Sequence, residues 1–84
     1  MPLAQLTLIG KPGCHLCDEA RAVVTAVMAE FDGVNLDEVS ILENADLHEK
    51  SVEEIPVLLI NGVVHNIWRV DPIRLRTALR EATQ

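Results

Sequence analysis

Aromatic side chains are scarce in this sequence, which has one Phe, one Trp and no Tyr among its 84 residues. The core must therefore be built from Val, Ile, Leu and Ala. The hydrophobic fraction of 49% is ordinary for a folded domain and argues against intrinsic disorder. Because independent domains usually need about 100 residues or more each, we expect one domain over residues 1–84.

Basic residues are also few, since seven Lys and Arg stand against thirteen Asp and Glu, which gives a net charge of −6. An acidic surface repels a phosphate backbone, so we expect no nucleic-acid partner.

Long apolar runs are missing, and none approaches the roughly 18 residues of a membrane-spanning helix. The first residues lack the basic start, apolar stretch and cleavage site of a signal peptide. We therefore expect a cytoplasmic protein with no membrane partner. A persistent structural disulfide would be unusual there, and two cysteines could form only one.

Hydrophobic periodicity and turn signals predict seven elements in the order β-α-β-α-β-β-α. A helix after Cys14 has apolar residues at helical spacing up to Phe31 and is expected to end at Asp32-Gly33. Asp71-Pro72 is typical of a capped start for the last helix. The other predicted elements are strands at 6–9, 34–41, 55–60 and 63–68 and a short helix at 45–51.

The connections between these elements predict the fold. A helix crossover joins the first two strands, which implies a parallel pair. Asn61-Gly62 between two apolar runs is a strong hairpin signal and implies an antiparallel pair. We therefore expect an α/β fold, a mixed four-stranded sheet with helices on both faces.

Both cysteines lie in the segment KPGCHLCDEA, at Cys14 and Cys17, where a glycine turn is expected to join a strand to a helix. The N–H groups of a helix N-terminus stabilise an anion, so Cys14 is expected to form a thiolate readily. Cys17 is one turn further, on the same face, with Cα atoms about 5–6 Å apart and within disulfide range. Such a pair provides an attacking thiolate and a resolving thiol.

Three other interpretations of the cysteines remain open. Both could be buried structural residues, because free cysteine is often buried. A structural zinc site would need two more ligands, for which His15, His48 and His65 are the candidates, although their spacing does not favour it. A cluster shared between two chains is the third, and we expect no metal site within one chain.

With this motif and element order, the chain resembles the glutaredoxins of the thioredoxin superfamily, and most closely small bacterial glutaredoxin-like proteins with a Cys-His-Leu-Cys active site. The resemblance implies a thioredoxin fold and a thiol–disulfide oxidoreductase, with Cys14 as nucleophile and Cys17 as resolving cysteine. Pro56 would match the cis-proline that faces the cysteines, and the backbone of Ile55 before it would pair with substrate. Lys11 matches a lysine that can meet a glutathione carboxylate.

The sequence also departs from the glutaredoxin pattern. The Gly-Gly pair that binds glutathione is missing from residues 65–71, so glutathione is doubtful as the reductant, and we expect no tightly bound cofactor. Trp68 could line a substrate groove, but packing against the last helix is the favoured interpretation. The expected partners are a disulfide-containing protein or small molecule and a cellular thiol reductant, with the chain a monomer. The alternative is a metal- or cluster-binding or redox-inactive interaction module.

Overall fold

The central feature is a four-stranded mixed sheet in the order β2-β1-β3-β4, seen in a computed structural model that describes residues 4–43, 46 and 54–83. The strands are β1 (Ala4–Gly10), β2 (Val34–Ser40), β3 (Val57–Ile60) and β4 (Val63–Ile67). As the sequence predicts, β1 and β2 are parallel, and β3 is antiparallel to both β1 and β4.

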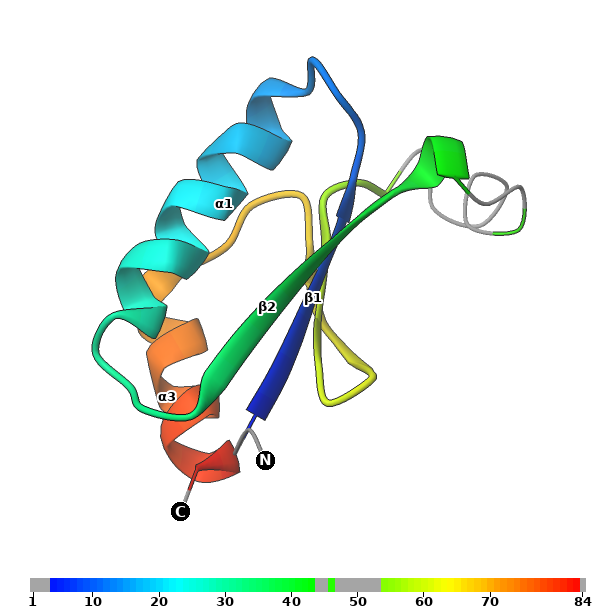
Figure 1. Cartoon of the computed structure of the whole chain (residues 1–84). Helices are drawn as coiled ribbons and strands as arrows, with labels where there is room; N and C mark the ends of the chain where they lie inside the picture. The colour runs from blue at the N-terminus through cyan, green and yellow to red at the C-terminus, as the bar shows by residue number, and fades with distance from the viewer. Residues whose placement is uncertain (1–3, 44–45, 47–53, 84) are drawn as a thin grey trace.

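Helices α1 (His15–Met28) and α3 (Pro72–Ala82) lie on the same face of the sheet, where they contact each other (Figure 1). The predicted helix at 45–51 lies outside the described residues except for Asp46, which is helical. A short 3-10 helix, η1 (Ile41–Glu43), follows β2.

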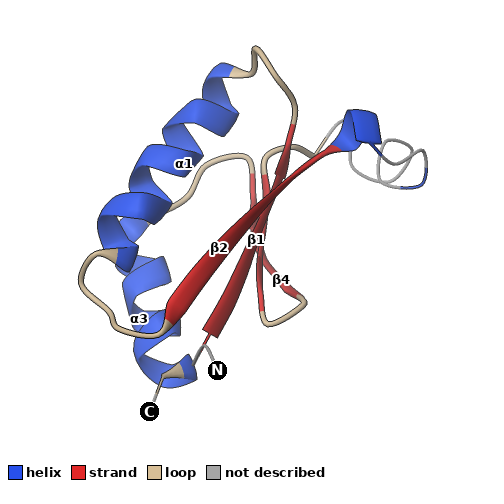
Figure 2. Ribbon diagram, viewed as in Figure 1, coloured by secondary structure: helices blue, strands red, loops and turns tan. Residues whose placement is uncertain are grey.

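The core is aliphatic, as the shortage of aromatic residues requires. Leu6 and Leu8 of β1 face Val24 and Val27 of α1, and Leu75 and Leu79 of α3 close the same cluster. Burying one such side chain contributes about 1.5–3 kcal/mol. Central strand β1 is thereby held between two neighbours and beneath both helices (Figure 2). The C-terminal end of β1 therefore gives rigid support to the segment that follows it, residues 11–14.

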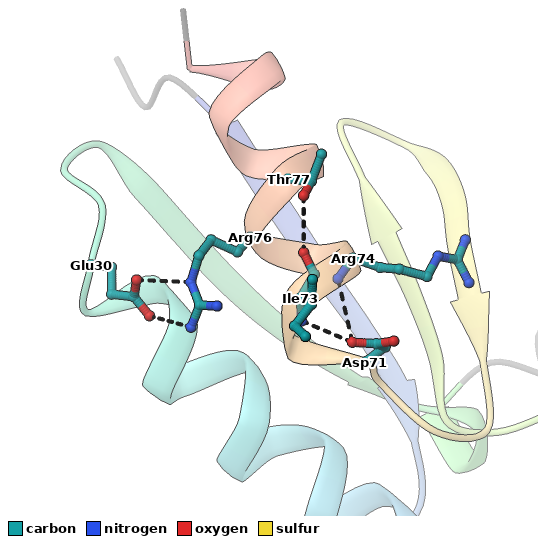
Figure 3. A network of polar contacts seen from close by, with 6 residues as sticks. All are labelled: Glu30, Asp71, Ile73, Arg74, Arg76 and Thr77. Carbon is teal, nitrogen blue, oxygen red and sulfur yellow. Dashed lines mark hydrogen bonds and ion pairs between the residues drawn. The ribbon is translucent and has the colours of Figure 1, made fainter.

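The predicted caps and turns are present, as local side-chain chemistry requires. Asn61 and Gly62 have φ of +51° and +83°, which a two-residue hairpin turn between β3 and β4 needs. The carboxylate of Asp71 accepts hydrogen bonds from the N–H groups of Ile73 and Arg74 at 2.8 and 3.4 Å and caps α3 (Figure 3).

Helix α1 ends earlier than expected. The sequence predicts a helix up to Asp32-Gly33, but α1 ends at Met28 with Ala29 as its C-cap. The N–H groups of Glu30 and Phe31 bond to carbonyls three residues back, at Val27 and Met28. The chain therefore tightens at this point and leaves the helix axis. Arg76 of α3 makes two hydrogen bonds, of 2.9 and 2.8 Å, to the Glu30 carboxylate in this turn (Figure 3).

Candidate functional site

The cysteine pair lies where β1 passes into α1. After Gly10 the chain turns through Gly13, whose φ of +76° suits glycine, and Cys14 takes the N-cap position of α1. The Cys14 Sγ accepts a hydrogen bond of 3.2 Å from the backbone N–H of Cys17. Because N–H groups at a helix N-terminus are otherwise unpaired and carry partial positive charge, this position stabilises negative charge on Sγ.

The two thiols differ in access to solvent, and burial perturbs the pKa of Cys17. Both are free, but Cys14 is only half-buried whereas the Cys17 side chain is 2% exposed. Burial, followed by the hydrogen bond with the Cys14 side chain, raises the pKa of Cys17 to about 11, although a hydrogen bond with the backbone of Lys11 acts in the opposite direction. Cys17 is therefore a protonated thiol at neutral pH, held behind the more accessible Cys14.

Gly10, the last residue of β1, is also part of the site. A Cβ at this position would lie 2.8 Å from the Cys17 Sγ and 3.3 Å from its Cβ. Such distances are far inside normal contact, so the absence of a side chain at Gly10 is what lets Cys17 approach the end of β1. A glycine in a strand often marks a close approach of this kind, but the sequence does not say to what.

The segment before β3 lies beside the cysteines, although it is far from them in the sequence. The Ile55-Pro56 peptide bond is cis, and both side chains are buried. Ile55 belongs to a small apolar cluster with Cys17, against which Cys14 packs. The structure thus brings together Cys14, Cys17 and Ile55-Pro56, the residues that the resemblance assigns to one site.

Lys11 lies on a different side of the pair. It is exposed and lines a cavity of about 370 Å³ together with Cys17, between the start of α1 and β2. At this cavity Arg21 of α1 bonds both the Asp18 carboxylate, at 3.0 Å, and the Glu38 carboxylate of β2. These hydrogen bonds raise the pKa of Arg21, and the one to Glu38 has the larger effect. A fixed ion-pair cluster therefore lies on the β2 side of the cysteine motif.

The position of Trp68 contradicts the favoured expectation that its side chain is buried against the last helix. Its side chain is 53% exposed and its φ is +65°. Its N–H donates a hydrogen bond of 2.8 Å to the Pro56 carbonyl, which fixes the loop after β4 beside the start of β3. The neighbouring Arg69 forms an ion pair of 3.4 Å with Glu19 in the first turns of α1. Tertiary contacts thus override the usual burial of a Trp in a small core.

The metal candidates are scattered in the described part of the chain. His15 is exposed at the start of α1, and half-buried His65 is in β4, where burial lowers its pKa. His48 lies outside the described residues. Within residues 4–43, 46 and 54–83, no three His, Cys, Asp or Glu side chains gather into a metal-binding group. Over the same ranges no helix has the length and apolar character needed to cross a membrane.

Residues 5–80 match the glutaredoxin-like domain (DUF836). The chain belongs to this family. An uncharacterized protein of Mycobacterium tuberculosis is 28% identical to this glutaredoxin-like chain over 99% of the chain and 90% of its own length. A structural-genomics protein from X. campestris is 30% identical, with a TM-score of 0.73 over 90% of this chain and 96% of its own.

Mitochondrial thioredoxin 3 from Saccharomyces cerevisiae has the same fold, with a TM-score of 0.68 at 13% identity over 96% of this chain and 80% of its own. The glutaredoxin-like chain therefore has a thioredoxin-like α/β fold with a mixed four-stranded sheet. The family and fold implied by the sequence are confirmed. The roles implied for Cys14, Cys17, Lys11, Ile55 and Pro56 remain predictions.

Proposed function

We propose that the protein is a thiol–disulfide oxidoreductase that cycles between a Cys14–Cys17 dithiol and a disulfide. The observation that carries the proposal is the asymmetry of the pair. The Cys14 Sγ is accessible and accepts the N–H of Cys17 at a helix N-terminus, while Cys17 is buried with a pKa raised to about 11. Cys14 is thus suited to attack a disulfide, and Cys17 to remain protonated until the second step.

The reaction has two exchange steps. The Cys14 thiolate attacks one sulfur of a substrate disulfide, so that a mixed disulfide forms and the other substrate sulfur leaves as a thiolate. Cys17 then loses its proton and attacks the Cys14 sulfur. The Cys14–Cys17 disulfide forms, and the second substrate sulfur leaves with the electron pair. The substrate disulfide gains two electrons from the protein. A cellular thiol reductant then supplies two electrons that reduce the Cys14–Cys17 disulfide to the dithiol.

The remaining site residues would position the substrate. Ile55 lies in the same apolar cluster as the cysteines, and Pro56, which follows it, is fully buried. The family resemblance assigns the backbone before the proline to substrate binding. Lys11 is exposed at the cavity beside Cys17, where it would attract an anionic group. The substrates would be protein or low-molecular-weight disulfides, reduced by a cytoplasmic monomer without a tightly bound cofactor.

Disulfide reduction tests the proposal directly. Purified protein is incubated with insulin and with a small mixed disulfide, each with glutathione or a thioredoxin reductase system as electron donor. We expect turnover with at least one pair, and its loss in Cys14→Ser. Cys14→Ser and a control substitution at the exposed His15, His15→Gln, are compared for folding by circular dichroism. If the wild-type protein reduces neither substrate with either donor, the proposal is wrong.

A further inference from the structure

The loop between β4 and α3 holds Trp68 in a conformation that its own side chain disfavours. Its φ of +65° is in the left-handed region, where a bulky residue is rare and strained. Asn and Gly adopt that conformation far more easily. The strain is retained for an exposed side chain, so burial of the indole in the core does not compensate for it.

Contacts on both sides of Trp68 fix the loop against the candidate site. The Trp68 N–H bonds the carbonyl of Pro56, next to the segment that packs beside Cys14 and Cys17. Arg69 pairs with Glu19, two residues after Cys17. The Asn66 side-chain amide also donates to the Arg69 carbonyl and closes the loop on itself. Figure 1 shows the loop running from the end of β4 past α1 to α3.

We propose that Trp68 is a specificity-determining residue, which contacts an apolar side chain next to the reacting cysteine of an extended polypeptide substrate. This inference rests on the proposed function. A half-exposed indole offers a rigid apolar surface at low entropic cost. A peptide that is bound beside Pro56 while its sulfur is joined to Cys14 extends past the loop that holds Trp68.

The same surface disfavours glutathione. Glutathione disulfide is a hydrophilic anion, and the indole offers its carboxylates no charge and only one N–H donor. The chain has a net charge of −6, and within this loop the one basic side chain, Arg69, is paired with Glu19. No glycine lies between residues 65 and 71 to let backbone approach a ligand closely. The substrate class is therefore a protein disulfide with apolar flanking residues.

Two matched peptides test this assignment. Each carries one cysteine as a mixed disulfide with thionitrobenzoate, flanked by Leu in one peptide and by Ser in the other. Attack of Cys14 on the peptide sulfur releases coloured thionitrobenzoate, which gives the rate of the first step. We expect the wild-type protein to prefer the Leu peptide about tenfold, as burial of roughly half an indole face allows.

The variants separate specificity from structure. Trp68→Asn removes the indole and suits the left-handed backbone, so it is expected to fold at least as stably as the wild type and to lose the preference for Leu. Trp68→Phe keeps an aromatic surface and is expected to retain part of it. Val63→Thr, which changes an exposed apolar residue at the hairpin end of β4, is the control and leaves the preference unchanged.

The fluorescence of the chain's single Trp provides a second readout. In Cys17→Ser, the trapped adduct with the Leu peptide is expected to shift Trp68 emission to shorter wavelength, whereas a mercaptoethanol adduct is not. Equal loss of both peptide rates in Trp68→Asn, or an unchanged preference, overturns the specificity role. If Cys14 of the wild-type protein attacks neither peptide, the failure belongs to the proposed function instead.

Discussion

Gly10→Ala tests the close approach on which the cysteine geometry depends. The new Cβ would lie 2.8 Å from the Cys17 Sγ, whereas ordinary contacts begin at 3.4 Å. Either Cys17 moves away by several tenths of an ångström or the end of β1 shifts. Overpacking of this kind costs typically about 1–3 kcal/mol, and we expect Gly10→Ala to lower the free energy of unfolding by about 2 kcal/mol.

A double-mutant cycle with Cys17→Ala isolates the contact. Cys17→Ala removes Sγ and leaves only the Cβ contact of 3.3 Å, so Gly10→Ala should cost about 1 kcal/mol less in its presence. The four proteins are compared by urea unfolding under reducing conditions. Gly62→Ala is the matched control, because its Cβ meets nothing within 4 Å and its cost, set by φ of +83°, is independent of Cys17. Equal costs of Gly10→Ala with and without Cys17→Ala would refute the reasoning.

Three further predictions follow from local contacts. In Cys14→Ala, Cys17 is the sole thiol, and ultraviolet absorbance should give it a pKa below about 11, because the Cys14 hydrogen bond and charge are lost, yet above 9.0, because burial remains. Arg76 lowers the pKa of Glu30, so the stability lost in Glu30→Gln should be measurable by thermal unfolding at neutral pH and vanish as the pH falls through that pKa. Asp71→Ala should cost about 1 kcal/mol in urea unfolding and Asp71→Asn almost nothing, because Asn also caps α3.

Local chemistry explains what could be predicted from the sequence. Asn61-Gly62 and Asp71-Pro72 form the expected turn and cap because each depends on residues a few positions apart. The place of Cys14 at the start of α1 is predictable for the same reason. The residue range of the sheet follows from apolar runs, although β3 begins at Val57 rather than at Ile55.

Tertiary contacts determine the features that could not be predicted from the sequence. The need for glycine at Gly10 arises from the approach of Cys17, which no local pattern records. Trp68 was expected to pack, but its place is set by the hydrogen bond of its N–H to Pro56 in a neighbouring strand segment. The Arg21 cluster likewise joins α1 to Glu38 of β2 and is invisible in the spacing of either element alone.

The most direct test of the central claim is mass spectrometry of the protein after exposure to a disulfide substrate, here the Leu peptide. The account predicts one peptide adduct on Cys17→Ser, none on Cys14→Ser, and an adduct-free Cys14–Cys17 disulfide in the wild type. A stable adduct on Cys17 of Cys14→Ser, with none on Cys14 of Cys17→Ser, would contradict it, because the buried thiol would then be the nucleophile.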